Sequence, residues 1–127
     1  MEKTILTTEE VKVYATNIER ETLQNPYYRR VLFTTPQMQL VVMKLYPGED
    51  IPMEVHQGTQ FVRIEKGVAL VQIENTQFYL QDDEIIMIPA GARHYFKNNG
   101  TDPLSIYSIY SPPEHPPTKI QYNQETE

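Results

Sequence analysis

The chain has 127 residues, a formal net charge of −6 at pH 7 and no cysteine. Its length suits one domain with one core, and a domain of this size needs neither a disulfide nor a metal in order to fold. The missing cysteines exclude disulfide bonds, thiolate metal sites and a thiol nucleophile, and they fit a reducing compartment. No Lys/Arg cluster is larger than the pair Arg29 and Arg30, so we expect no nucleic-acid partner.

The hydropathy of the sequence indicates where the protein is located. No apolar run approaches the roughly 20 residues of a membrane span, and the first ten residues are too polar for the apolar region of a signal peptide. We therefore expect a cytoplasmic protein with no membrane partner.

Nine tyrosines and ten prolines against no tryptophan favour short strands and turns over long helices. The composition predicts an all-β protein.

Residues 1–27 are expected to form an N-terminal extension. A helical turn fits within Thr7–Gln24, because Thr7 or Thr8 offers an N-cap oxygen. Acidic residues at 9 and 10 suit the first turn of such a helix, where they meet the positive end of its dipole.

From Tyr28 to Tyr110 the sequence falls into short apolar or alternating runs, each closed by a turn signal. This spacing is typical of an all-β sandwich or barrel built from hairpins. The expected strands are Tyr28–Phe33, Gln39–Tyr46, Glu54–His56, Gln60–Glu65, Val68–Ile73, Gln77–Leu80, Glu84–Ile88, His94–Asn98 and Leu104–Tyr110.

Residues 111–127 are predicted to form a proline-rich C-terminal tail outside the barrel of residues 28–110. Four of the ten prolines fall within Pro112–Pro117, which prevents regular pairing and favours an extended path. We expect Ser111–Pro117 to lie along the barrel surface or across a partner subunit, with His115 as a surface residue of the tail.

Two of the three histidines stand where a metal site is possible. On a strand, Glu54 and His56 would leave the same face because they are two residues apart. Alternation in the next strand points Gln60 inward together with Val62 and Ile64. In the strand after residue 93, the alternation points His94 inward with Phe96 and Asn98. Glu54, His56, Gln60 and His94 are therefore expected to converge in an otherwise apolar interior.

Such a convergence has two interpretations. Buried polar groups must be paired, so a histidine beside a carboxylate is consistent with a hydrogen-bond network alone. Two imidazoles and one carboxylate also form the set that suits Fe(II) and accommodates Zn(II), Mn(II) or Ni(II). Spacing by itself leaves both interpretations open.

Two longer stretches resemble the paired motifs of the cupin family, G-x5-H-x-H-x3-4-E-x6-G and G-x5-P-x-G-x2-H-x3-N. Seven of the ten marked positions are identical in this chain: Gly48, His56, Gly67, Pro89, Gly91, His94 and Asn98. Glu54 replaces the first histidine, Gln60 replaces the glutamate, and Asp83 stands at the first glycine of the second motif. Arg29–Met43 and the segment from Tyr110 to Pro116 also resemble short single-domain cupins of the mannose-6-phosphate-isomerase-like group.

The resemblance implies a cupin double-stranded β-helix, that is, a jelly-roll barrel with a site in its mouth. It also implies one divalent ion (Zn, Mn, Fe or Ni) on Glu54, His56 and His94, with Gln60 as a weaker fourth ligand. The carboxylate has moved from the later motif position to the earlier one, so the ligand charge is kept. Cupins commonly pair through outer strands, which implies a homodimer.

The first hypothesis for function is a metal-dependent isomerase or epimerase on a small polar substrate such as a sugar. The second is a cupin that binds a small ligand without turnover, because no further inward-facing carboxylate, lysine or histidine is predicted near the ligands. The third is a non-haem Fe(II) oxygenase, which uses the same ligand set. A phosphate-binding site would need basic residues near the cavity, and the sequence indicates none there. No catalytic residue is assigned.

Overall fold

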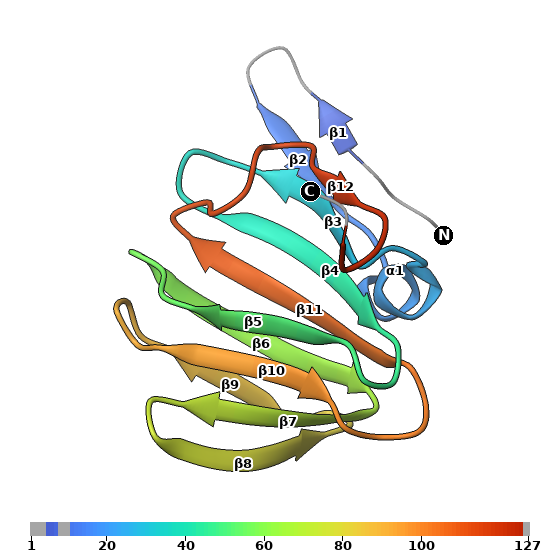
Figure 1. Ribbon diagram of the computed structural model, residues 1–127. Helices are drawn as coiled ribbons and strands as arrows, with labels where there is room; N and C mark the ends of the chain where they lie inside the picture. The colour runs from blue at the N-terminus through green and yellow to red at the C-terminus, as the bar shows by residue number, and fades with distance from the viewer. Residues whose placement is uncertain (1–4, 8–10, 126–127) are drawn as a thin grey trace.

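Two antiparallel sheets facing each other form a barrel in the computed structural model, which describes residues 5–7 and 11–125 (Figure 1). The larger sheet has the strand order β12-β3-β4-β11-β6-β9, and the smaller has the order β5-β10-β7-β8. The strands are β3 (Arg29–Thr34), β4 (Gln39–Leu45), β5 (Asp50–Glu54), β6 (Thr59–Lys66), β7 (Val68–Ile73), β8 (Thr76–Gln81), β9 (Ile85–Ile88), β10 (His94–Asn98), β11 (Leu104–Ser111) and β12 (Ile120–Gln121). This is the jelly-roll arrangement predicted from the sequence.

Strand alternation places one face of each central strand in the core. In β6, Gln60, Val62 and Ile64 are buried, while their neighbours in the strand are more exposed. In β10, His94, Phe96 and Asn98 are buried in the same way. The inward faces predicted for both strands are confirmed. Apolar side chains from both sheets complete the core, among them Val41, Met43, Leu45, Val71, Leu104 and Ile106.

One predicted strand is wrong. Glu54–His56 was expected to be a strand, but β5 runs from Asp50 to Glu54 and ends there, so His56 lies in the following loop. β5 is an edge strand paired only with β10, and this position tolerates Pro52, which has no N–H to donate. The argument that Glu54 and His56 share a strand face therefore does not apply.

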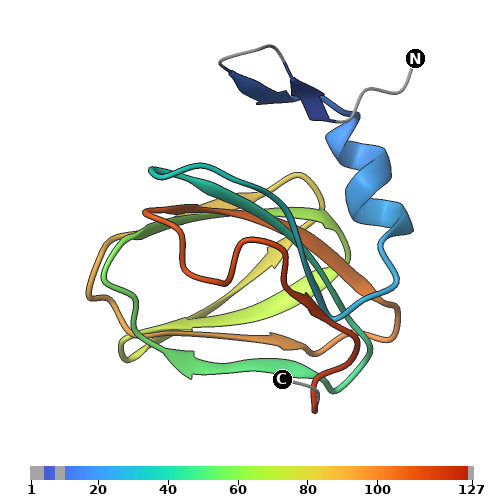
Figure 2. The ribbon, with the colours of Figure 1, turned by 90° about the horizontal axis from the view of Figure 1, so that it is seen from above.

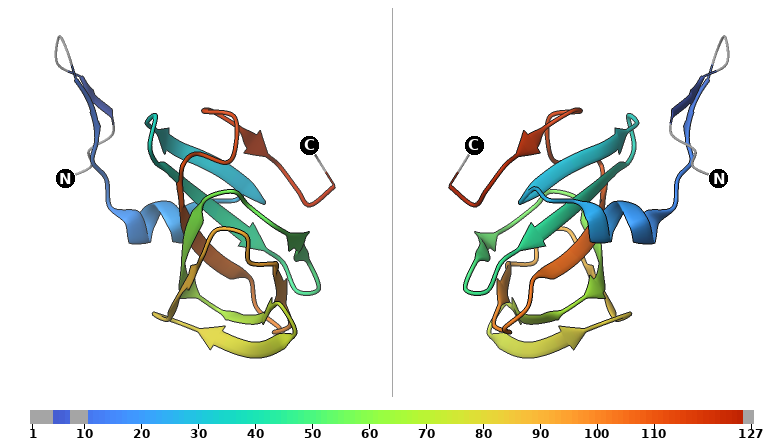
Figure 3. Two further views of the ribbon diagram at one scale, coloured as in Figure 1. Left: turned by 90° about the vertical axis from the view of Figure 1, so that its left-hand side faces the viewer. Right: turned by 90° about the vertical axis from the view of Figure 1, so that its right-hand side faces the viewer.

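The N-terminal part holds more regular structure than the sequence indicated. β1 (Ile5–Thr7) and β2 (Lys12–Tyr14) form an antiparallel hairpin, followed by α1 (Ile18–Gln24). The N-cap of α1 is Asn17, whose side-chain oxygen accepts a bond from the backbone of Arg20 at 3.0 Å. The predicted cap at Thr7 is wrong because Thr7 ends β1, and Thr8 with the acidic pair after it lies outside the described residues. Figures 2 and 3 show the hairpin standing off the barrel beyond α1.

Two glycines of the motifs lie in turns. Gly67 has φ +115° between β6 and β7, and an added Cβ would lie 3.0 Å from the Cα of Leu104. Gly91 has φ +84° in the turn before β10. Side chains rarely adopt these dihedral angles, so both positions favour glycine.

The C-terminal strap, residues 111–125, folds back over the larger sheet instead of leaving the barrel (Figure 3). Buried Gln39 anchors it, because its side-chain oxygen accepts from the backbone of His115 at 2.9 Å and its amide donates to the carbonyl of His115 at 2.7 Å. Further along, Ile120 and Gln121 of β12 pair with β3. Of the two predicted alternatives, the structure shows this segment along the barrel, although Ser111 itself is the last residue of β11. No helix in the described part of the chain is long and apolar enough to cross a membrane.

Candidate metal and ligand site

The four predicted ligands come together at one end of the barrel, each from a different segment. His94 opens β10 and stands opposite Glu54, the last residue of β5, in the strand register. Opposite residues of an antiparallel pair lie on the same face. Gln60 is the second residue of β6. His56 comes from the loop after β5, and its carbonyl accepts a bond from the backbone of Gly91 at 3.0 Å. That bond ties the first motif to the turn of the second.

Distances confirm that the two imidazoles and the carboxylate are neighbours. The Nε2 atom of His56 lies 3.8 Å from Oε2 of Glu54. The ring centroids of His56 and His94 are 4.7 Å apart, with 56° between the ring planes. Both histidines are buried, whereas Glu54 keeps 32% of its side chain exposed at the mouth. The predicted convergence is therefore present.

In both rings, an oxygen atom of the protein lies close to Nδ1. In His94, Nδ1 lies 2.9 Å from the carbonyl of Ala92. In His56, Nδ1 lies 3.2 Å from Oε1 of Glu114. A carbonyl oxygen only accepts hydrogen bonds, so the ring of His94 carries its proton on Nδ1 and leaves Nε2 with a free lone pair. Metal-binding histidines in proteins are held in this way.

Burial lowers the pKa of His94, and the neighbouring His56 lowers it further, against opposing effects from Ala92 and the nearby carboxylates. The ring is consequently neutral near pH 7. Neutral imidazole is the form that binds a metal.

Gln60 is oriented by its amide nitrogen. That nitrogen donates to the hydroxyl of Ser108 at 3.3 Å and to the hydroxyl of Tyr110 at 3.2 Å, both on β11. The amide oxygen is buried and has no hydrogen-bond partner. A buried acceptor without a donor is costly, and a cation or a ligand hydroxyl beside it would remove that cost.

These residues fit a divalent ion by donor type, by the bond that holds the ring of His94 and by the unpaired oxygen of Gln60. Their donor atoms do not surround a common point, however. Within residues 5–7 and 11–125, no group of three His, Asp or Glu residues is arranged to hold a metal ion as it stands. The site therefore holds residue types that suit a metal ion, but their side chains are not arranged around one.

The strap adds two residues that the sequence prediction missed. Glu114 reaches the ring of His56 as described, and its backbone N–H also bonds to Gln39. His115 is half-buried, and its ring packs edge-on against Tyr110 with 5.2 Å between centroids. The expectation that His115 is a surface residue is wrong, because Gln39 holds the strap down at this position. Burial lowers the pKa of His115 to about 3, and the cations Arg29 and Lys119 contribute.

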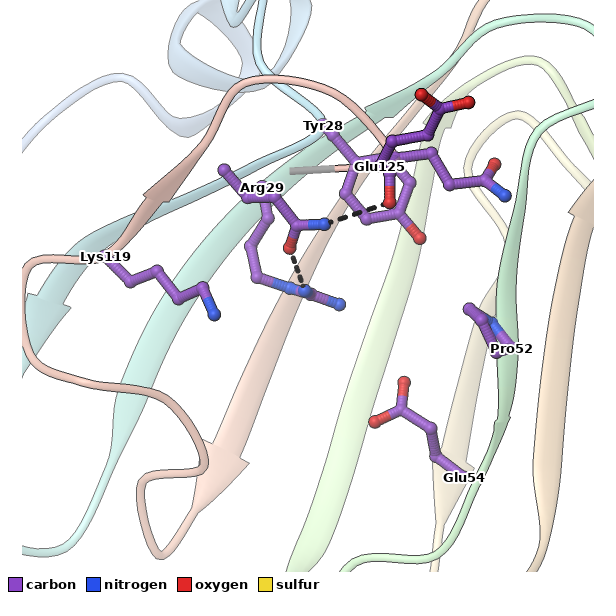
Figure 4. A pocket seen from close by; sticks show the side chains of 8 residues that line it. Tyr28, Arg29, Pro52, Glu54, Lys119 and Glu125 are labelled. Carbon is purple, nitrogen blue, oxygen red and sulfur yellow. Dashed lines mark hydrogen bonds between the residues drawn. The ribbon is translucent and has the colours of Figure 1, made fainter. Parts of the chain in front are cut away.

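Basic residues also line the barrel mouth, contrary to expectation. A cavity of about 350 Å³ opens beside Glu54, and Arg29 from β3 and Lys119 from the strap project into it (Figure 4). The sequence signal for Arg29 was present in the alternation of β3, where Arg29 and Val31 face inward and Arg30 faces out. Nothing in the pattern of the tail indicates where Lys119 lies.

A family model described as "Cupin domain" matches residues 41–110, more than half of the chain. The chain belongs to the cupin family. The match begins in β4, ends in β11 and includes all four predicted ligands.

Relatives agree with this membership. An uncharacterized protein of Acanthamoeba polyphaga mimivirus is 47% identical over 114 residues, which cover 86% of this chain and 71% of that protein. The uncharacterized protein YrkC of Bacillus subtilis is 41% identical over 112 residues, 83% of this chain and 60% of that protein. A crystal structure of a Bacillus halodurans protein superposes with a TM-score of 0.87 at 38% identity, covering 94% of this chain and 96% of that one. The structural likeness to the Bacillus halodurans protein thus extends well beyond the residues that the family model matches.

Proposed function

We propose that this cupin binds one divalent metal ion through Glu54, His56 and His94, with the amide oxygen of Gln60 as a fourth donor, and acts on a small polar substrate. One observation carries the proposal. His94 is held through Nδ1 by the carbonyl of Ala92, which leaves its Nε2 lone pair available, and the ring of His56 lies beside it with Nε2 3.8 Å from the carboxylate of Glu54. Two imidazoles and one carboxylate suit Fe(II) and accommodate Zn(II), Mn(II) or Ni(II).

The residues have distinct parts in this proposal. His94 and His56 supply neutral nitrogen donors, and Glu54 supplies the negative charge. Gln60 offers a neutral oxygen that Ser108 and Tyr110 keep in place through the amide nitrogen. When bound, a divalent ion would supply a Lewis acid that polarises a carbonyl or hydroxyl oxygen of the substrate. An isomerase or epimerase acting on a sugar uses such polarisation, and the sequence resemblance to sugar-related cupins supports that class.

A second candidate is a cupin that holds a small ligand without turnover. The two carboxylates nearest the imidazoles, Glu54 and Glu114, both face His56. His115, with its pKa near 3, is a weak base. Among the described residues around the donors, none is an evident general base, and this supports ligand binding alone.

Elemental analysis of protein purified without chelators tests the proposal. We expect about one equivalent of a first-row divalent metal per chain. Iron would direct the next assay to oxygen uptake and the oxygenase alternative, whereas zinc, manganese or nickel would direct it to aldose–ketose exchange followed by deuterium incorporation. Protein that contains no metal, and takes up none of these ions after dialysis against each in turn, would refute the proposal.

A further inference from the structure

Arg29 is a buried cation with few partners. Its residue is 8% exposed, and it projects from β3 toward the barrel mouth. One guanidinium nitrogen, Nη1, donates to the side-chain oxygen of Gln121 at 2.6 Å, and the guanidinium lies 5.4 Å from the ring centroid of Tyr28. These two neighbours are both neutral, so they do not balance the charge.

The positive charge of Arg29 is uncompensated within the described part of the chain. No carboxylate there forms an ion pair with the guanidinium, and its Nε atom is buried without a hydrogen-bond partner. A buried charge is costly unless it is paired and hydrogen-bonded. The guanidinium of arginine is permanently charged in proteins, so this cost persists. An anion beside Arg29 would lower it.

The space for such an anion is the cavity of about 350 Å³ at the mouth. Figure 4 shows Arg29 and Lys119 projecting into it from one side and Glu54 from the other. Glu125 also lines the cavity, but its carboxylate is directed away from the guanidinium. The complete lining is Tyr28, Arg29, Pro52, Glu54, Lys119, Gln121, Gln124 and Glu125. Two cations therefore share one side of a cavity that reaches the proposed metal ligand Glu54.

We propose that this cavity binds a small molecule through an anionic group, a carboxylate or a phosphate, held by Arg29 and Lys119. The planar guanidinium presents pairs of N–H groups that match two oxygens of such a group, and lysine adds a point charge. The anion subsite stands on Arg29 and the cavity alone. Only the placement of the rest of the ligand, toward Glu54 and the metal donors, depends on the proposed function.

The volume of the cavity suits a small ligand, and the positive charges beside it favour an acidic one. Cavities that hold small molecules begin at about 300 Å³, so this one suits a molecule of about the size of a monosaccharide acid. The positive field extends beyond the cavity wall, since Arg29 and Lys119 add to the burial that keeps His115 neutral. The substrate class inferred here is an acidic small molecule with a further polar group.

The test uses malonate and inorganic phosphate as probes of the two anion classes. Each is titrated into the full chain after removal of metal with a chelator, while the backbone amide resonance of Gln121, which lines the cavity and is present in every variant, is followed by NMR. We expect saturable shifts with a Kd of about 1 mM for at least one probe. Arg29→Gln should weaken that binding by about tenfold or more. Arg30→Gln is the matched control, because Arg30 is its exposed neighbour with the same charge, and it should change the Kd less than about twofold.

The two probes also identify the anion. Preference for malonate assigns a carboxylate ligand, and preference for phosphate assigns a phosphorylated one. Lys119→Gln, on the half-buried strap side of the cavity, provides a second variant if Arg29→Gln fails to fold, and it should weaken binding by a few-fold. The inference is overturned if neither probe shifts the resonance at about 20 mM, or if both arginine variants weaken binding equally. Since the chelated protein is used, these outcomes are independent of whether the metal proposal holds.

Discussion

In β10, the two-residue period of a strand decides which side chains face the site. In the C-terminal strap, the segment with Glu114 and His115 has no such period, and individual hydrogen bonds place its side chains. His94, Phe96 and Asn98 are all buried because alternate residues share a face. Glu114 and His115 reach the same site because the backbone there is bonded to the side chain of Gln39. One region is positioned by periodicity and the other by a single buried anchor, and the following variants test that difference.

The largest expected effect is the loss of metal binding after removal of a ring on the barrel side. His94→Ala and His56→Ala should each lower metal affinity by at least about 100-fold, because even residues that only support a ligand contribute tenfold or more. Titration calorimetry measures the change. His115→Ala removes the third histidine and should keep the ion. If either of the first two variants binds metal as the wild type does, the ligand assignment is wrong.

A smaller effect separates the two oxygen donors. Glu54→Gln should weaken metal binding by about 10- to 100-fold, since a dication gains much more from a carboxylate than from an amide. Gln60→Ala should cost less than about tenfold, because water replaces a neutral oxygen. The same calorimetry, with folding checked by circular dichroism, ranks the two variants. A larger loss of metal affinity in Gln60→Ala than in Glu54→Gln would contradict the charge argument. It would mean that Gln60 contributes more to metal binding than a neutral oxygen donor should.

The anchor of the strap is tested through stability. Gln39→Leu removes the acceptor for the backbone of Glu114 and His115 and the donor to the carbonyl of His115, so we expect the free energy of unfolding to fall by about 2–3 kcal/mol. Urea unfolding measures it. Gln37→Leu is a matched control, because that residue is exposed and its bonds come from the backbone, where the carbonyl accepts from Ser111 and the N–H donates to Thr35. Equal losses in both variants would show that Gln39 is not the anchor.

The smallest expected effect is a pH dependence of stability that originates in the strap. Burial lowers the pKa of His115 to about 3, against about 6.5 in an unfolded chain. Between these values the unfolded state binds a proton that the folded state does not, so stability is present above about pH 6.5 and is lost as the pH falls through this window. His115 is only half-buried, which reduces the expected loss to about 1–2 kcal/mol.

Metal-free wild type and His115→Gln, unfolded in urea at several pH values between about 4 and 7, isolate this contribution. The glutamine variant should show the shallower dependence. Parallel curves for the two proteins would mean that His115 is protonated as readily in the folded state as in the unfolded one.

The sequence predicted the barrel and its inward faces well, because alternation in β6 and β10 is long enough to show its period. The predicted ligands lie near one another for a partly different reason than the one expected. Glu54 and His56 were placed together by strand parity, yet β5 ends at Glu54, and His56 approaches because Gly91 holds its carbonyl. A bond between two loops has no period, so only the spacing of the motifs indicated it.

The missed residues share a physical feature, which is that each depends on a partner distant in the chain. His115 is 76 residues from Gln39, and Arg29 is 92 residues from Gln121. The inward face of Arg29 was readable from its strand, but the cavity beside it exists only because the strap closes over β3. Proline density correctly predicted the irregular path and could not show where that path leads.

The boundary of the cupin match at residue 110 has a consequence for protein engineering. The proposed metal donors lie inside residues 41–110, whereas Arg29, Lys119 and Gln121 of the proposed anion subsite lie outside. Under both proposals, ligand preference and metal binding are encoded in separable stretches of sequence. A library that randomises residues 116–121 while keeping the anchor contacts of Glu114 and His115 would vary the charge of the mouth and leave the donors intact. Such a chain could be redirected from acidic to neutral molecules without rebuilding its barrel.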